Sequence, residues 1–283
     1  MRGTLALAFI WAFQPPPGGP GASPREAIRW ERNFDEALKK AKAARKPLLV
    51  DFWAEWCGWC RRLDRTTYID PQVVRITGDH FIAVKVNTEG SAKEIDVAVR
   101  YDVSTLPTIA FLSPAGRPLA RLNGFQGPSQ FPRSLEAARE VAARVGGWEQ
   151  MLERDRDDVA ALQGLGVHLF EQDAYRESAE LLERAAKLDE GRALDERKQT
   201  RLLLGAILKS DQKYSAAEKV LRAGLALPAS SAYDPKLLYV LGKLYAAQGR
   251  VEEARTVLQQ VITLHAESAI AQKARETLIA LGR

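Results

Sequence analysis

The stretch that decides the fold reads Leu48-Leu-Val-Asp-Phe-Trp-Ala-Glu-Trp-Cys-Gly-Trp-Cys60. Its first six residues are almost wholly apolar, which is typical of a short strand buried on both faces of a sheet. Cys57 and Cys60 follow this strand and should lie at the start of the next helix. We therefore expect a strand, a short connection and a helix, with both cysteines of the chain where they meet.

The position of the two cysteines indicates redox chemistry. A helix N-terminus stabilises negative charge, so Cys57 should have a lowered pKa and be the attacking thiolate. Cys60 lies three residues further on the same helix face, within reach of the sulfur of Cys57. Such a pair can attack a disulfide, form a mixed disulfide and resolve it internally.

Two other interpretations of the pair stay open. A zinc site needs two further ligands, yet the three histidines are widely separated: His80, His168 and His265. A purely structural disulfide would close so small a loop that it restrains little chain entropy. We expect no metal and no organic cofactor, only the redox-active Cys57–Cys60 pair.

Composition limits the remaining classes of function. The 283 residues suggest two domains, and 46% hydrophobic with 27% charged residues is ordinary for globular proteins. Two cysteines exclude a scaffold held by several disulfides. The 41 Lys and Arg residues are scattered among 36 Asp and Glu, without a basic block interleaved with aromatics. We therefore expect no nucleic-acid partner.

The N-terminal residues 1–24 resemble an export signal. One arginine precedes about ten apolar residues, Thr4 to Phe13, and a Pro/Gly-rich leader follows. A membrane-spanning helix would need about 20 apolar residues, so we expect no stable membrane insertion. The expected location is the periplasm or another exported compartment. If the segment is not a signal peptide, the location is cytoplasmic.

Residues 25–147 show the pattern of an α/β domain. Strands are expected at 48–53, 81–86, 108–112 and 119–122, and helices at 33–45, from 57, at 92–101 and at 129–145. Alternating strands and helices, closed by a hairpin and a helix, predict a mixed sheet flanked by helices. Gly146-Gly147 marks the expected domain boundary.

Residues 148–283 show an all-α repeat pattern. Leu-Gly pairs at Gly166, Gly205 and Gly242 recur 39 and 37 residues apart. Each glycine is followed by a small residue after twelve positions and by a leucine after sixteen. Small residues where helices touch and large residues in the gaps are typical of stacked helix pairs. This region resembles the tetratricopeptide family, with about three repeats forming a helical solenoid.

Residues 33–145 resemble the thioredoxin family. The resemblance extends beyond the two cysteines: Asp51 matches the buried aspartate of the family, which helps to move the proton of the second cysteine. Lys85, in Val84-Lys-Val-Asn87, matches the lysine beside that aspartate. A buried carboxylate near a lysine is physically sensible, because desolvation raises its pKa into a useful range. The resemblance therefore implies Cys57, Cys60, Asp51 and Lys85 as the catalytic residues.

The same resemblance implies a substrate-binding surface around the cysteines. Pro107 matches the cis-proline loop of the family, which packs against the cysteines and offers backbone to the substrate. Trp56 and Trp59 could form an apolar apron suited to a protein substrate. The expected substrate-binding residues are Trp56, Gly58, Trp59, Leu106 and Pro107.

The residues between the cysteines leave the redox direction open. Thioredoxins proper carry Gly-Pro there, whereas this chain carries Gly58-Trp59. The segment Arg65–Val73, with Leu106 before Pro107, is more similar to the periplasmic C-terminal domain of the membrane thiol:disulfide interchange protein family. That resemblance favours a reductase or isomerase over an oxidase.

Two functions follow. The first is an exported thiol-disulfide oxidoreductase that acts on protein thiols or disulfides, is recharged by an upstream dithiol donor, and docks a peptide or protein partner on its repeats. The alternative is an interaction adaptor in which the repeats bind the partner and the thioredoxin-like part is mainly a scaffold.

Overall fold

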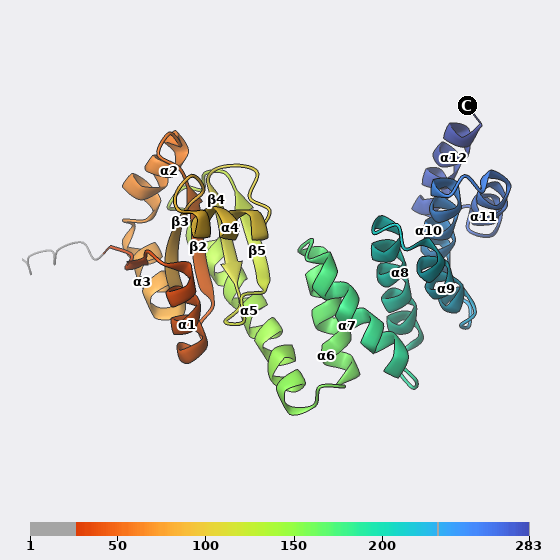
Figure 1. Cartoon of the computed structure of the whole chain (residues 1–283), viewed down its shortest axis with the longest axis horizontal. Helices are drawn as coiled ribbons and strands as arrows, with labels where there is room; N and C mark the ends of the chain where they lie inside the picture. The colour runs from red at the N-terminus through yellow and green to blue at the C-terminus, as the bar shows by residue number, and fades with distance from the viewer. Residues whose placement is uncertain (1–26, 231, 283) are drawn as a thin grey trace, which may run out of the picture.

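The computed structural model describes residues 27–230 and 232–282 and shows an α/β part followed by a row of helices (Figure 1). The export signal expected over residues 1–24 lies outside the described residues. The α/β part contains β1 (Trp30–Glu31), α1 (Phe34–Ala44), β2 (Leu48–Trp53), α2 (Gly58–Arg62), the π-helical turn η1 (Leu63–Thr67), α3 (Pro71–His80), β3 (Ile82–Asn87), α4 (Ala92–Arg100), β4 (Thr108–Leu112), β5 (Pro118–Asn123) and α5 (Phe131–Arg154). The row contains α6 (Val159–Glu171), α7 (Tyr175–Leu188), α8 (Leu194–Ser210), α9 (Tyr214–Leu225), α10 (Asp234–Ala247), α11 (Val251–Leu264) and α12 (Ala269–Leu281).

The five strands form one mixed sheet in the order β1-β3-β2-β4-β5. β2 pairs in parallel with β3 and antiparallel with β4, and β4 pairs antiparallel with β5. β2 is thus the central strand, and five of its six residues are buried. The register places Asp51 beside Lys85 on β3 and beside Ile109 on β4. The mixed sheet expected from the sequence is confirmed.

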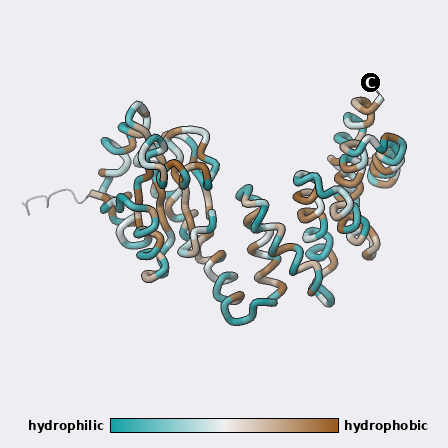
Figure 2. Tube along the Cα trace, viewed as in Figure 1, coloured by the Kyte–Doolittle hydropathy of each residue, from teal (hydrophilic) through white to brown (hydrophobic). Residues whose placement is uncertain are grey.

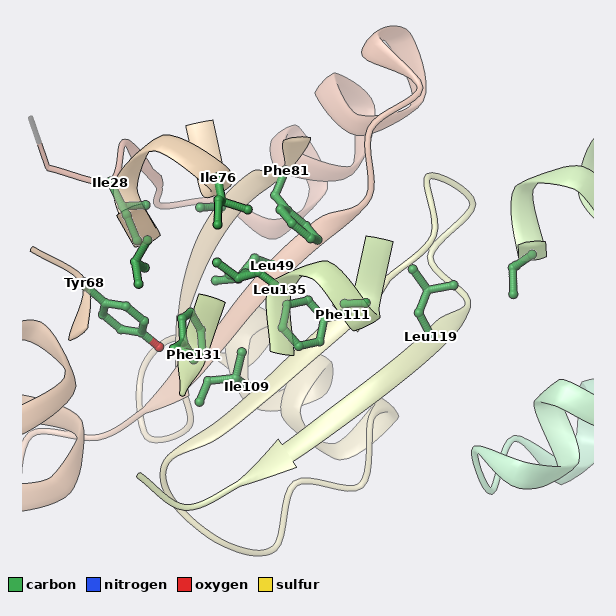
Figure 3. Close-up of a cluster of buried hydrophobic side chains, with 14 of the residues drawn as sticks. Ile28, Leu49, Tyr68, Ile76, Phe81, Ile109, Phe111, Leu119, Phe131 and Leu135 are labelled. Carbon is green, nitrogen blue, oxygen red and sulfur yellow. The ribbon is translucent and has the colours of Figure 1, made fainter. Parts of the chain in front are cut away.

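Helices cover both faces of the sheet, and alternate residues of β2 supply the two cores. Leu49 belongs to the cluster beneath α3 and α5, where the rings of Tyr68 and Phe131 pack edge to face (Figure 3). Val50 and Phe52 belong to the cluster beneath α1 and α4. Because successive side chains of a strand point to opposite faces, a strand that serves two cores is apolar at nearly every position, and Asp51 is the one polar residue of β2. Figure 2 shows hydrophobic residues concentrated in the strands and recurring along each helix of the row.

Helix α5 is longer than the sequence predicted. The expected end at Val145 is wrong, because the helix continues through Gly146-Gly147 to Arg154. Val145 is buried, and the apolar stripe continues through Trp148, whose ring contacts α6 at Gly164 so closely that a Cβ there would lie 2.4 Å from it. Burial of this stripe offsets the helix-breaking tendency of the two glycines, about 1 kcal/mol each. The domain boundary expected at Gly147 stays a prediction, and one unbroken helix crosses it.

Three helix pairs, α6–α7, α8–α9 and α10–α11, repeat the same contact, and α12 follows them. In each pair the glycine of the first helix faces a leucine of the second: Gly166 with Leu182, Gly205 with Leu221, and Gly242 with Leu258. A Cβ on any of these glycines would lie 2.5 to 2.9 Å from the leucine. The predicted three-repeat pattern is confirmed, and its glycines are required by the close approach of the two helices.

The first helix pair packs directly on the α/β part. One hydrophobic cluster contains Leu119 of β5 together with Leu162 and Leu169 of α6. The ring nitrogen Nε2 of His168 lies 2.9 Å from the backbone oxygen of Pro118. The two parts therefore share a core. The end of α5 from which the row departs lies at the opposite end of the sheet from α2 (Figure 1).

One arginine, which forms two ion pairs, also connects the α/β part to the first helix pair. Arg117, in the turn between β4 and β5, pairs with Glu149 of α5 at 2.8 Å and with Glu177 of α7 at 2.7 Å. Its side chain is about one quarter exposed, so these pairs are only partly screened by water.

No helix within residues 27–230 and 232–282 has both the length and the hydropathy that a bilayer crossing requires.

Gly205→Ala should lower the free energy of unfolding of the helical row by about 1–3 kcal/mol, because the added methyl group would overpack the contact with Leu221. Urea denaturation followed by circular dichroism measures the change. Gly147→Ala is the matched control, since it also lies within a helix but has nothing within 4 Å of the added Cβ. It should be neutral or stabilising by up to about 1 kcal/mol. Equal effects of the two substitutions would contradict the packing role of Gly205.

Candidate redox site

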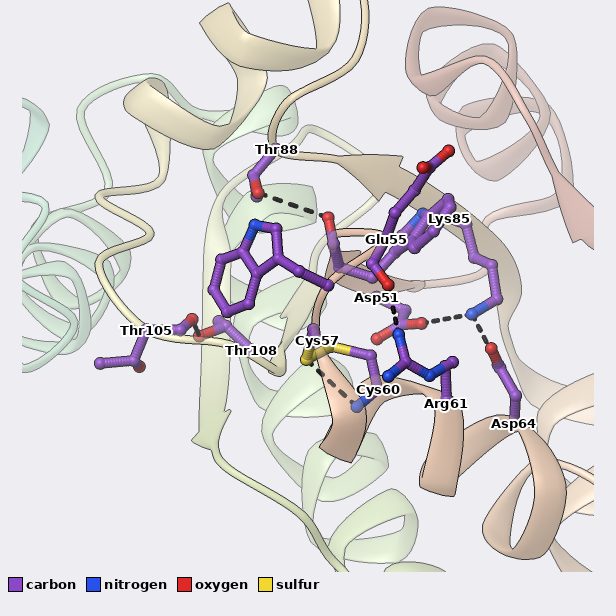
Figure 4. The surroundings of a disulfide bond; sticks show 12 residues. Asp51, Glu55, Cys57, Cys60, Arg61, Asp64, Lys85, Thr88, Thr105 and Thr108 are labelled. Carbon is purple, nitrogen blue, oxygen red and sulfur yellow. Dashed lines mark hydrogen bonds and ion pairs between the residues drawn. A yellow bond between two sulfur atoms is a disulfide. The ribbon is translucent and has the colours of Figure 1, made fainter.

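Cys57 and Cys60 form a disulfide where β2 passes into α2 (Figure 4). Cys57 is the N-cap residue of α2, and the backbone N–H of Cys60 donates a hydrogen bond to its Sγ at 3.1 Å. The backbone N–H of Cys57 donates to the oxygen of Ala54 at 3.1 Å, which fixes the turn between strand and helix. In the reduced protein the same N–H of Cys60 would stabilise a thiolate on Cys57.

The disulfide is almost completely covered by its neighbours. Cys57 is 3% exposed and Cys60 is 1% exposed. Gly58, between them, is exposed, and a Cβ there would contact only the end of the Arg61 side chain at 3.9 Å. A partner must therefore approach Cys57 across the surface formed by the neighbouring side chains.

Asp51 lies on β2, six residues before Cys57, and is completely buried. Nζ of Lys85 lies 2.6 Å from its Oδ2, so the two residues that were expected to lie together do so. The other carboxylate oxygen, Oδ1, has no hydrogen-bond partner among the described residues, and neither has the buried hydroxyl of Tyr68. Burial raises the pKa of Asp51, although Lys85 opposes that change.

Lys85 binds a second carboxylate that the sequence analysis did not identify. Oδ1 of Asp64, on η1, lies 2.7 Å from Nζ of Lys85. The ammonium group also lies 4.8 Å from the ring centre of Trp30 and 5.3 Å from that of Tyr68. Burial alone would lower the pKa of Lys85, but the two carboxylates outweigh it and raise that pKa. Lys85 therefore stays charged beside Asp51.

The segment around Pro107 lies beside the disulfide, as Figure 4 shows for Thr105 and Thr108. The Leu106–Pro107 peptide bond is cis, and Pro107 is buried. Its backbone oxygen accepts a hydrogen bond from Gly124 at 2.8 Å. Leu106 is half-buried and packs against the core beneath α1 and α4, so most of its side chain is directed into the protein.

Two tryptophans form an exposed rim around the cysteines. Trp56 is 65% exposed, and its Nε1 donates to Glu89 at 2.7 Å. Trp59 is 54% exposed, and its ring lies 5.5 Å from that of Phe125. Large exposed aromatic side chains are typical of protein contact surfaces.

Sequence reasoning missed Asp64, Tyr68 and Phe125 at this site. Asp64 and Tyr68 follow Cys60 by four and eight residues; Asp64 lies within the π-helical turn η1 and Tyr68 is its C-cap residue. Phe125 lies in the loop after β5, more than sixty residues after Cys60 in the sequence. The acidic residue four positions after Cys60, in Arg61-Arg62-Leu63-Asp64, was the available signal for Asp64. No group of three or more His, Cys, Asp or Glu side chains suited to a metal ion occurs in the residues that the structure describes.

Asp51→Asn should raise the stability of the oxidised protein at neutral pH and leave it nearly unchanged below the ordinary aspartate pKa of 3.8. Because the folded-state pKa is raised, the unfolded chain loses its proton first. Wild-type stability attributable to Asp51 therefore falls as the pH rises from that value through the folded-state pKa. Urea midpoints measured across this range test the difference between the two proteins.

The exposed substitution Asp96→Asn serves as the control for removing one carboxylate from the surface. A constant difference between wild type and Asp51→Asn at every pH would contradict a raised pKa for Asp51.

Both parts of the chain are similar to known proteins. Residues 34–139 match the family model of a thioredoxin-like domain, and residues 208–278 match that of a tetratricopeptide repeat. The chain is similar to the thiol:disulfide interchange protein DsbD of Salmonella typhi, with 32% identity over 141 residues that cover 46% of this chain and 24% of that protein. It is also similar to thioredoxin Y, chloroplastic, of Oryza sativa subsp. japonica, with 37% identity over 110 residues that cover 39% of this chain and 60% of that protein.

Among solved structures, a thioredoxin from Thermus thermophilus is 28% identical, covers 43% of this chain and 94% of its own, and has a TM-score of 0.39. The chain spans about a quarter of the length of the interchange protein that it matches. The two resemblances expected from the sequence are confirmed by the family models, one for each part of the fold. The chain joins a thioredoxin-like domain to a tetratricopeptide repeat region.

Proposed function

We propose that this protein is a thiol-disulfide oxidoreductase that passes two electrons to disulfides of other polypeptides. The observation that carries the proposal is the covered Cys57–Cys60 disulfide, which caps α2 close to a buried carboxylate paired with a lysine. A disulfide kept only for stability would have no use for Asp51, because its burial costs free energy when it is charged. The family match of residues 34–139 supports the same chemistry.

The proposed reaction starts from the reduced protein. The Cys57 thiolate attacks one sulfur of the client disulfide and forms a mixed disulfide, and the other client sulfur leaves as a thiolate. Cys60 then loses its proton and attacks Sγ of Cys57, and the first client sulfur leaves. The products are a client dithiol and the Cys57–Cys60 disulfide, so two electrons have moved to the client.

Asp51 and Lys85 have distinct roles in this proposal. Asp51, which has a raised pKa and whose Oδ1 has no hydrogen-bond partner among the described residues, accepts the proton of Cys60. Lys85 holds the other oxygen at 2.6 Å and thereby fixes the carboxyl group. Asp64 keeps the lysine in place from its other side.

Client binding is assigned to the surface around Cys57. Trp56 and Trp59 supply exposed aromatic area, and Gly58 leaves room between them. The backbone before Pro107 supplies hydrogen-bonding groups to an extended client segment, as in β-strand addition. Leu106 contributes through that backbone more than through its half-buried side chain.

We further propose the reducing or isomerising direction, an upstream dithiol as electron donor, and export directed by residues 1–24. The similarity to a thiol:disulfide interchange protein supports this direction. The repeats in the proposed domain 148–283 would dock a peptide or protein partner, since stacked helix pairs form an extended surface. The thioredoxin-like domain would comprise residues 25–147.

The reduction potential of the Cys57–Cys60 pair tests the direction. Titration of the full protein against glutathione should give a value nearer to the reducing end of the known range, about −270 mV, than to the oxidising end, about −120 mV. A value near the oxidising end would overturn the reductase assignment. A pair that does not exchange with glutathione at all would favour the adaptor.

Cys60→Ser should trap clients as mixed disulfides through Cys57, because the first attack proceeds and the second cannot. Cys57→Ser should trap none, since it is Cys57 that occupies the N-cap of α2, where the backbone N–H of Cys60 stabilises a thiolate. Non-reducing gel electrophoresis after incubation with a disulfide-containing polypeptide measures the adduct. Full rescue of a deletion phenotype by Cys57→Ser would show that the redox step is dispensable and would support the adaptor.

A further inference from the structure

The rim of the disulfide carries an arginine held by aromatic rings. The guanidinium carbon of Arg62 lies 5.2 Å from the ring centre of Trp59 and 4.8 Å from that of Phe125. Arg62 belongs to α2, two residues after Cys60, and Phe125 belongs to the loop after β5. We call these three side chains the Arg62 platform. It combines two side chains of α2, the helix that carries Cys60, with a side chain of the loop after β5.

Arg62 has no carboxylate within ion-pair distance in the described part of the chain, unlike Lys85 and Arg117. The nearest acidic residue in sequence, Asp64, is occupied by Lys85 at 2.7 Å. A guanidinium that lies over aromatic rings still has N–H donors that can form two hydrogen bonds with one carboxylate. The guanidinium of Arg62 is therefore able to bind a carboxylate of another molecule.

The charges around the disulfide are divided between its two sides. Arg62 supplies the positive charge beside Trp59, whereas the side chain of Arg61 donates to the backbone oxygen of Glu55. Beside Trp56 the charge is negative, because the indole N–H donates a hydrogen bond to the carboxylate of Glu89. A client segment that crosses the cysteines therefore meets positive charge beside Trp59 and negative charge beside Trp56.

We propose that the Arg62 platform selects client disulfides in which an acidic residue lies next to an apolar residue beside the reacting cysteine. This inference rests on the proposed oxidoreductase function. The apolar residue packs on Trp59 and Phe125, and the carboxylate binds the edge of Arg62. Trp and Arg are the residue types that most often dominate binding at protein interfaces.

A structural role for Arg62 gives a different expectation. Arg61 and Arg62 occupy the last turn of α2, where positive charge is favourable for a helix. If Arg62 only stabilised the helix, replacing it would change the stability of the protein and would change the reaction rates of all clients by the same factor. Selectivity between matched clients is therefore the decisive measurement.

The probes are disulfide-linked dimers of a short synthetic peptide with one cysteine preceded by leucine and followed by glutamate, glutamine or lysine. The full-length reduced protein is oxidised by each peptide, and the rate is divided by that of dithiothreitol with the same peptide. This ratio removes the effect of the flanking charge on the intrinsic reactivity of the disulfide. For wild type at low salt, we expect the glutamate peptide to exceed the glutamine peptide about two- to fivefold, and the lysine peptide to be slowest.

Arg62→Met keeps an apolar stem on the rings and removes the charge, so the preference for glutamate should fall to about one. Arg62→Lys should keep part of the preference. Arg75→Met, an exposed arginine on α3, is the matched control for net charge and should keep all of it. About 1 M salt, which shortens the Debye length to about 3 Å, should reduce the wild-type preference.

Equal preferences in wild type and Arg62→Met, or loss of preference in Arg75→Met as well, would overturn the proposal. The rate with the glutamine peptide shows separately that each variant is folded and active. If no peptide oxidises even the wild-type protein, the proposed oxidoreductase function itself fails, which is a different result from equal rates.

Discussion

The ion pair between Asp51 and Lys85 constrains both the fold and the site. A buried carboxylate is costly, and it is tolerated here because the parallel register of β2 and β3 places a lysine directly beside it. The same strand that carries Asp51 supplies both hydrophobic cores and ends at the turn to Cys57. One central strand therefore positions the carboxylate, contributes to both hydrophobic cores and places the disulfide.

The joint between the two parts depends on continuity of one helix. Because α5 does not end at Gly147, the side chains of Val145 and Trp148 extend the core of the sheet toward α6. Buried apolar contacts and the pairs of Arg117 hold the first repeat against β5. A flexible linker would let the repeats move independently, whereas a shared helix and core couple their orientation to that of the sheet.

How much could be read from the sequence depends on how local each feature is. The sequence predicts features that depend on short local patterns. Examples are the apolar strand before Cys57, the spacing of the two cysteines, and the recurring glycines and leucines of the repeats. Asp51 and Lys85 could be paired only through the resemblance to a family. The end of α5 was predicted wrongly, because the packing of Trp148 on Gly164 decides it and the glycines suggest the opposite. Phe125 reaches Trp59 from a distant loop, which no local pattern reveals.

The arrangement of the chain implies how the two parts could cooperate. The row of helices leaves α5 at the end of the sheet opposite to α2, so the repeats do not cover the disulfide (Figure 1). The side chains of Trp56 and Trp59 remain exposed. A partner docked on the repeats can reach Cys57 only if it extends along the thioredoxin-like domain. Because the first repeat shares a core with the sheet, the fold sets the distance between the repeats and Cys57.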